Sequence, residues 1–143
     1  MKVLVDGSNI VFICWSIAKS QLRKEKGDDY IMKEEDVPLF YHVLLRKFFS
    51  LFTVYKDIII AMEGENSTAW RKNIFPGYKE NRSKRNDDSE YQLLKTLFPK
   101  IDSLLSLFRC KVLSVPGAEG DDVIYTLAKK YSEAGEEVLV ISS

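Results

Sequence analysis

Short apolar runs rich in β-branched residues constrain the fold of this chain more than any other feature. They occupy residues 3–5, 58–62 and 138–141, and helical patterns flank them. A short run that is apolar throughout is typical of a strand buried on both faces of a parallel sheet. A fourth candidate strand covers residues 111–115 and stops before a Pro-Gly pair. The pattern predicts an α/β sheet.

Helical periodicity fills the intervals between these strands. Residues 38–55 carry apolar side chains at helical spacing, and Asp36 precedes them as a candidate N-cap. A second helical region covers residues 89–108 and has a broad apolar stripe. Pro99 lies inside that region and lacks a backbone donor, so we expect it to bend or divide the helix.

The remaining segments complete an alternation of strands and helices. A third helix is expected to begin at Asp121 or Asp122 and to end at Gly135. Residues 19–36 mix charges of both signs, which predicts a solvated helix end and a loop. This alternation indicates a doubly wound layered α/β fold. Ligands of such folds bind beyond the carboxyl ends of the strands.

Size and composition limit the class of protein. A chain of 143 residues with 45% hydrophobic content can bury one core, so we expect a single domain or part of one. It has no run of about 18 apolar residues and no signal-peptide pattern, which predicts a cytoplasmic protein. Cys14 and Cys110 form no CxxC motif and are expected to be buried free thiols.

Charge is segregated along a chain whose formal net charge is zero. Residues 71–85 contain six basic side chains and one acidic side chain, whereas residues 119–122 contain three carboxylates. Trp70, Phe75 and Tyr78 lie among the basic residues, a composition that can hold a polyanion and stack on bases. The alternative is a solvated basic loop whose aromatic rings pack on the domain.

Acidic residues follow the predicted strands and begin the third helix. Asp6 and Glu63 each stand after a strand and before a glycine. Glu119, Asp121 and Asp122 lie where exposed helix N–H groups tolerate negative charge, so each acid could simply cap a turn or a helix. If Asp6 and the three later acids converge, their mutual repulsion calls for a cation, and an oxygen-only pocket suits Mg²⁺ or Mn²⁺. The chemistry of such a pocket is hydrolysis of a phosphate ester.

Several motifs together resemble the flap endonuclease/5′-3′ exonuclease family, especially its phage members described as RNase H. They are Leu-Val-Asp-Gly-Ser near the start, Trp70-Arg71-Lys72, Tyr78-Lys79-x-Asn81-Arg82, Glu119-x-Asp121-Asp122 and the final Val-Leu-Val-Ile-Ser-Ser. The resemblance covers essentially the whole chain. It implies a PIN-like three-layer domain with a mostly parallel central sheet and a helical arch at residues 77–100.

The resemblance also implies an activity and a set of site residues. The activity is hydrolysis of DNA or RNA near 5′ ends or flaps by two divalent ions, Mg²⁺ or Mn²⁺. Glu63 stands where relatives usually carry Asp. The implied metal-site residues are Asp6, Glu63, Glu119, Asp121 and Asp122; the implied catalytic cations are Lys79 and Arg82; the implied nucleic-acid contacts are Arg71, Lys72, Tyr78, Lys84 and Arg85.

The final residues suggest what such a nuclease would need in addition. In the family, the last strand is followed by an Asp-x-Asp motif and a helix-hairpin-helix region, neither of which occurs here. We therefore expect a nuclease portion that requires a complementary C-terminal segment or chain and acts on DNA with a 5′ flap or 5′ end, or on an RNA-DNA hybrid. The expected host is a bacterial or phage-infected cell. Two alternatives remain: a non-catalytic nucleic-acid-binding domain and a stand-alone PIN-type ribonuclease.

Overall fold

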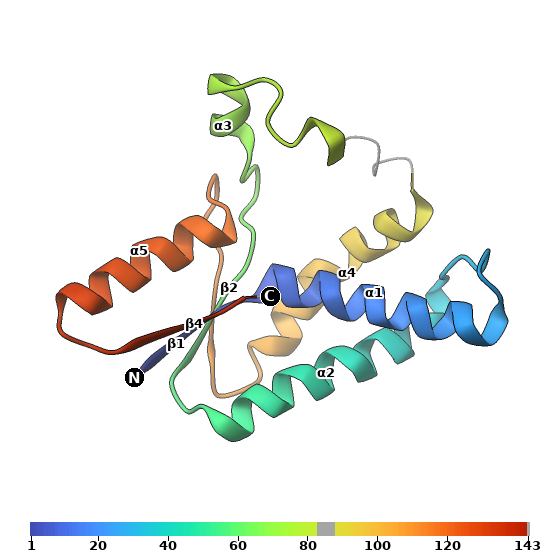
Figure 1. Ribbon diagram of the computed structural model, residues 1–143, viewed down its shortest axis with the longest axis horizontal. Helices are drawn as coiled ribbons and strands as arrows, with labels where there is room; N and C mark the ends of the chain where they lie inside the picture. The colour runs from blue at the N-terminus through green and yellow to red at the C-terminus, as the bar shows by residue number, and fades with distance from the viewer. Residues whose placement is uncertain (83–87, 143) are drawn as a thin grey trace.

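The chain folds into three layers around a parallel sheet (Figure 1). This computed structural model describes residues 1–82 and 88–142. The strands are β1 (Lys2–Asp6), β2 (Ile58–Ala61), β3 (Lys111–Leu113) and β4 (Val138–Ile141), in the spatial order β3-β2-β1-β4. Every pairing between neighbouring strands is parallel. The predicted α/β fold with a parallel sheet is confirmed, and the fourth candidate strand ends two residues earlier than expected.

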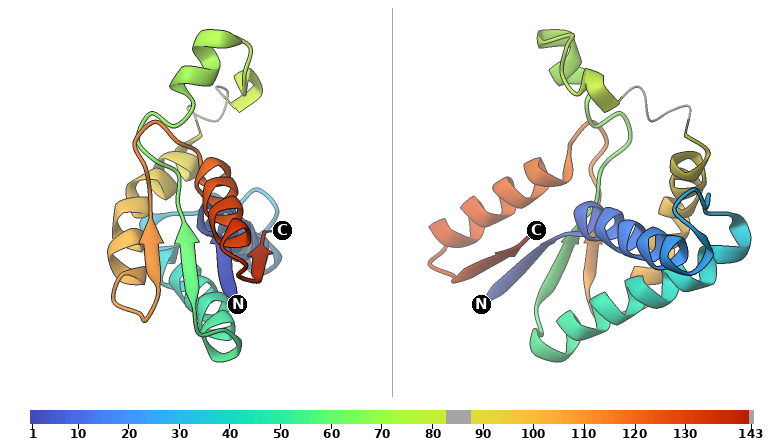
Figure 2. Two further views of the ribbon diagram at one scale, coloured as in Figure 1. Left: turned by 90° about the vertical axis from the view of Figure 1, so that its left-hand side faces the viewer. Right: turned by 45° about the vertical axis from the view of Figure 1, so that its right-hand side comes forward.

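Alternating side chains of β1 and β2 enter two different cores. Val3 and Val5 pack with α1 (Gly7–Lys26), α2 (Val37–Val54) and α4 (Ser89–Leu105), whereas Leu4 packs with α5 (Gly120–Glu133). Figure 2 shows α5 and the other long helices on opposite faces of the sheet. Because both faces are covered, the inner strands are apolar at every buried position, which is why their runs were visible in the sequence.

Of helix α1, only the end was predicted, as part of the charged segment 19–36. The helix begins directly after β1, with the Asp6 carboxylate accepting a hydrogen bond from the Asn9 N–H at 3.0 Å. Its charged second half remains helical through Lys26, because apolar side chains at helical spacing, among them Trp15 and Leu22, anchor it in the core. The loop expected within residues 19–36 is therefore confined to its second half, where a short 3₁₀ helix, η1 (Glu34–Asp36), precedes α2.

Helix α2 matches the predicted helix 38–55 closely. Asp36 lies at its N-cap position, but the Asp36 side chain accepts hydrogen bonds from the Lys33 N–H and the Tyr30 hydroxyl instead of capping α2. Together, η1 and α2 are long and apolar enough to cross a membrane by length and composition alone. Phe40, Leu44 and Phe48, however, are buried in the core, which is the normal fate of such a stripe in a packed domain.

Helix α4 continues through Pro99 and ends at Leu105. Pro99 does not divide the helix, because buried Leu94, Leu97, Ile101 and Leu105 hold both halves against the core, and the bend expected as the alternative stays a prediction. Residues 106–108, predicted to be helical, form turns instead. The short helix α3 (Ala69–Ile74) was not predicted, and Figure 1 shows it beyond the end of the sheet. The arch assigned to residues 77–100 stays a prediction.

The two cysteines are free, as expected. Cys14 is buried in the core and Cys110 is half-buried. Burial raises the pKa of both thiols, so neither has the reactive character of a low-pKa cysteine.

Candidate metal and nucleic-acid site

The acidic side chains predicted to carry chemistry gather at the carboxyl edge of the sheet. Asp6 ends β1 and pairs in register with Ala61, the last residue of β2, so Glu63 follows two positions beyond that level. The loop after β2 is joined to the loop before α5 by the Gly64 N–H, which donates to the Ala118 carbonyl at 3.0 Å. This contact brings Glu63 close to Glu119, the N-cap residue of α5.

Gly64 allows these two loops to meet. A Cβ atom at this position would lie 1.7 Å from the Val115 carbonyl oxygen. The Gly117 N–H also donates to the Glu65 carbonyl at 2.7 Å, and the Met62 N–H to the Leu113 carbonyl at 2.8 Å. Three backbone hydrogen bonds between the loops therefore fix the position of the acidic helix start.

Two of the predicted metal-site acids cap helices, as the alternative interpretation allowed. The Asp6 carboxylate caps α1, and Asp122 Oδ2 accepts a hydrogen bond from the Glu119 N–H at 2.9 Å. Each cap leaves other carboxylate lone pairs available, since an ionised carboxylate accepts about four hydrogen bonds. Capping accounts for the position of these acids and is compatible with a second role.

Basic side chains neutralise Glu119 and Asp122. Arg71 forms a two-pronged ion pair with Asp122, in which Nη1 lies 2.9 Å from Oδ2, and Nη1 also lies 3.4 Å from Glu119 Oε2. Lys79 Nζ lies 2.6 Å from Glu119 Oε1, and the Tyr78 hydroxyl donates to the same carboxylate. Glu119 is 4% exposed, so it needs these partners to remain buried as an anion. The Arg71 hydrogen bonds hold the pKa of Asp122 below its usual range.

Lys79 has an unusual backbone. Its φ angle is 54°, in the left-handed region that residues other than glycine seldom adopt. Strain of this kind costs about 1–3 kcal/mol and tends to cluster at functional sites. Here the strained turn directs the Lys79 ammonium group onto Glu119.

In the described part of the chain, Asp6, Glu63 and Asp121 form no ion pair with a Lys or Arg side chain, although the charge of Lys79 acts on Glu63. Partial burial, together with repulsion from Asp121, raises the pKa of Asp6. Partial burial raises the pKa of Glu63, and repulsion from Glu119 adds to this effect, whereas hydrogen bonds to Ser67 and the Gly120 backbone and the charge of Lys79 oppose it. Burial is the larger cause of both shifts, and the neighbouring carboxylates add to it.

The donor chemistry of this edge suits a hard cation, although the side chains do not form a closed cage. All five predicted metal-site residues offer carboxylate oxygens, the ligands that Mg²⁺ and Mn²⁺ prefer. Within residues 1–82 and 88–142, no three acidic, His or Cys side chains are grouped so that they could hold one ion. Glu119 and Asp122 are turned toward Arg71 and Lys79 instead.

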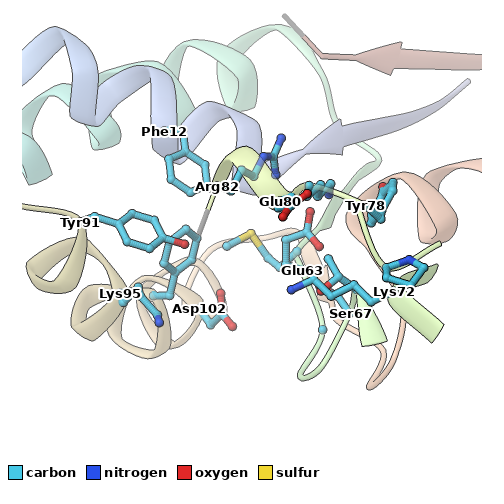
Figure 3. A pocket seen from close by; sticks show the side chains of 16 residues that line it. Phe12, Glu63, Ser67, Lys72, Tyr78, Glu80, Arg82, Tyr91, Lys95 and Asp102 are labelled. Atoms are coloured by element: carbon cyan, nitrogen blue, oxygen red, sulfur yellow. The ribbon is translucent and has the colours of Figure 1, made fainter. Parts of the chain in front are cut away.

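A cavity of about 610 Å³ adjoins the acidic edge. Figure 3 shows Glu63, Lys72 and Tyr78 on one side and α4 residues on the other. Lys79 and Arg82, the predicted catalytic cations, also line it. Lys84 and Arg85, predicted nucleic-acid contacts, lie outside the described residues.

The α4 side of this cavity was not predicted from the sequence. Tyr91, Lys95, Phe98 and Asp102 recur at helical spacing and line the cavity, and Phe12 of α1 joins them. The spacing was a usable signal, but α4 was interpreted only through its apolar core stripe.

Comparison with known proteins gives a consistent assignment. The family model described as 5′-3′ exonuclease, N-terminal resolvase-like domain matches residues 1–143. The chain is 34% identical over 100 residues to a 5′-3′ exonuclease of Aquifex aeolicus, covering 68% of this chain and 32% of that protein. It is 30% identical over 92 residues to ribonuclease H of enterobacteria phage T4, covering 62% and 30%. It is 33% identical over 79 residues to flap endonuclease Xni of Pectobacterium atrosepticum, covering 55% and 28%.

The chain spans about a third of the length of these relatives. The predicted family is confirmed by the match over the whole chain and agrees with the parallel α/β architecture. The chain therefore belongs to the 5′-3′ exonuclease family, and its residues 1–143 match the N-terminal resolvase-like domain of that family.

Proposed function

We propose that this chain is the nuclease portion of a divalent-metal-dependent 5′ nuclease that hydrolyses phosphodiesters near 5′ ends or flaps of DNA. One observation carries the proposal: a strand-end acidic cluster lies directly against a strained basic turn, with Lys79 Nζ 2.6 Å from Glu119. A phosphoryl-transfer site needs carboxylates that bind metal ions, and it needs basic side chains that bind the phosphate. Here the two kinds of side chain lie next to each other.

Asp6, Glu63, Glu119, Asp121 and Asp122 are the proposed holders of two ions, Mg²⁺ or Mn²⁺. When bound, such ions activate water and neutralise charge on the scissile phosphate. The raised pKa values of Asp6 and Glu63 fit this role, because partly buried carboxylates beside other carboxylates gain from a neighbouring cation. Glu119 and Asp122 can contribute once Arg71 and Lys79 turn to another anion.

Lys79 and Arg82 are the proposed catalytic cations. Both line the cavity next to the acidic edge, so their charges can reach a phosphate placed between the carboxylates and the cavity. Cations positioned in advance stabilise the charge that develops during hydrolysis. Arg71, Lys72 and Tyr78 are proposed to hold the neighbouring nucleotides, as are Lys84 and Arg85.

The substrate and partners are proposed from the relatives. One relative is named flap endonuclease and another ribonuclease H, which supports DNA with a 5′ flap or 5′ end and, secondarily, an RNA-DNA hybrid. Because the described residues hold no closed group of three metal-binding side chains, we propose that a further segment or chain completes the site. A cytoplasmic location, in a bacterial or phage-infected cell, is proposed with it.

The test is cleavage of a labelled 5′-flap substrate. The chain is assayed alone and together with the C-terminal two-thirds of a relative, in Mg²⁺, Mn²⁺ or EDTA. We expect metal-dependent cleavage that Asp121→Asn abolishes. Asp57→Asn is the matched control, because Asp57 pairs with Lys2 at the opposite edge of the sheet.

Other outcomes separate the competing functions. Flap binding that is independent of divalent ions and survives Asp121→Asn, with no cleavage under any condition, indicates a non-catalytic binding domain. Cleavage of single-stranded RNA by residues 1–143 alone indicates a stand-alone ribonuclease. Cleavage that is equal in wild type and Asp121→Asn contradicts the assignment of the acidic edge.

A further inference from the structure

The cavity beside the acidic edge has one aromatic wall and one basic wall. Phe12 and Tyr91 have nearly parallel rings, 6.4 Å apart and inclined by 14°, and Phe98 lies 5.7 Å from Phe12. Lys72 and Arg82 line the same cavity, and Figure 3 shows Lys72 across from the aromatic side. Its volume of about 610 Å³ lies within the range of small-molecule sites.

Asp102 is an unexpected residue in this wall. It lines the cavity from the last turn of α4, where the helix dipole disfavours a negative charge. Its Oδ1 atom is buried and has no hydrogen-bond partner in the described part of the chain. Burial raises the pKa of this carboxyl. A buried acceptor without a donor is costly, and a donor bound in the cavity that Asp102 lines would offset this cost once the carboxylate turns toward it.

The chemistry of the walls identifies the class of ligand. Flat apolar rings stack on a planar heterocycle, cations attract the phosphates attached to it, and a carboxylate accepts hydrogen bonds from N–H groups on its edge. A nucleotide combines all three features. An inorganic anion would use only the cations, and an apolar ligand would leave Asp102 without a partner.

We propose that this cavity takes up one unstacked nucleobase of a bound single strand, and that Asp102 accepts a hydrogen bond from the exocyclic amino group of that base. The inference rests on the proposed function, because it assumes that a nucleic-acid strand passes the acidic edge. It makes Asp102 a specificity residue that favours cytosine, adenine and guanine over thymine and uracil. Lys72 and Arg82 hold the phosphates on either side of the base.

The experiment compares two oligomers that differ at the proposed contact. Fluorescence anisotropy measures binding of labelled octamers of deoxycytidine and deoxyuridine in EDTA, where no metal-dependent cleavage occurs. Cytosine offers an amino group where uracil offers a carbonyl oxygen. We expect wild type to bind the cytosine oligomer about fivefold more tightly, the ratio that one hydrogen bond of ordinary net strength gives.

Substitution of Asp102 then assigns the preference. Asp102→Asn presents both a donor and an acceptor, so the ratio of affinities should fall toward one while both oligomers still bind. Tyr91→Leu should weaken the binding of both oligomers and leave the ratio of their affinities above one. Asp57→Asn, at the far edge of the sheet, should change neither quantity. Thermal melting confirms that each variant is folded.

Failure of this inference can be told apart from failure of the proposed function. Equal binding of both oligomers by wild type, or a preference that Asp102→Asn leaves intact, overturns the base pocket while nucleic-acid binding stands. Absence of binding to both oligomers overturns the pocket and the nucleic-acid assignment together. A cytosine preference without flap cleavage supports the pocket and counts against the nuclease.

Discussion

The close approach at Gly64 gives the sharpest test of how the acidic edge is built. Gly64→Ala adds one methyl group that would lie 1.7 Å from the Val115 carbonyl oxygen, whereas real Cβ atoms essentially never approach within 3.0 Å. The obstacle is backbone, so no side chain can rotate away. The loop after β2 and the loop before α5 must therefore separate by more than an ångström.

The loss of stability in Gly64→Ala can be estimated from this geometry. Overpacking of a rigid contact costs about 1–3 kcal/mol. The hydrogen bonds from Gly64 to Ala118 and from Gly117 to Glu65 cross the same contact, and each contributes about 0.5–1.5 kcal/mol. We expect Gly64→Ala to lower the free energy of unfolding by about 2–4 kcal/mol, since partial relaxation will preserve some of these bonds.

Gly120→Ala is the matched control, because Gly120 also lies at the acidic edge. A Cβ atom there would meet nothing closer than 3.7 Å, and the residue begins α5, where alanine is favourable. Urea denaturation should show a large loss of stability for Gly64→Ala and a change within about 1 kcal/mol for Gly120→Ala. Mn²⁺ binding should weaken in Gly64→Ala, as Glu119 moves away from Glu63. Equal stability of the two variants would refute the described loop contact.

Three further predictions concern charged side chains. Glu90→Ala should lower the free energy of unfolding in urea by about 2–4 kcal/mol, because the buried Glu90 carboxylate binds Arg23 at 3.0 Å and the buried Met32 N–H at 3.3 Å; a loss below about 1 kcal/mol would contradict this network. Arg71→Ala should raise the pKa of Asp122, measured by carboxyl NMR titration, and stability from this pair should be present above the ordinary Asp pKa of about 3.9 and disappear as pH falls through the lower folded pKa. Asp102→Asn should stabilise the protein by up to about 1 kcal/mol at neutral pH and by little near pH 3.5. The cost of the charged carboxylate is absent below the ordinary Asp pKa, grows as pH rises from there to the raised folded pKa, and is complete above it. An equal effect at both pH values would contradict this prediction.

The parts of the fold that sequence predicted are those governed by local pattern. Strands β1 and β2 were visible because both of their faces are buried, and α2 because its apolar stripe is regular. Helix α3 has only six residues and no buried side chain, so it left no periodic signal. The end of α4 was misplaced because apolar residues continue past the last helical turn.

The candidate site was predicted as a set of residues, and their partners were not. Arg71 and Asp122 lie 51 positions apart, and Lys79 and Glu119 lie 40 apart. Pairing over such distances depends on how the loops after β2 and β3 meet, which composition does not encode. The acidic residues were predicted to bind metal and the basic residues to bind nucleic acid, whereas in the structure the two sets form ion pairs with each other.

This mutual neutralisation predicts a linkage between cation and strand. Arg71 and Lys79 compensate Glu119 and Asp122 in the chain alone, so a divalent ion that takes the carboxylates must displace these cations, and a phosphate that takes the cations must release the carboxylates. Each event makes the other less costly, because the separated charges find new partners together. The factor by which Mn²⁺ raises oligonucleotide affinity should then equal the factor by which the oligonucleotide raises Mn²⁺ affinity. Calorimetric titrations of each ligand, with and without the other, measure both factors. Arg71→Ala should bring them closer to one, whereas independent binding in wild type would show that these ion pairs do not connect the two halves of the site.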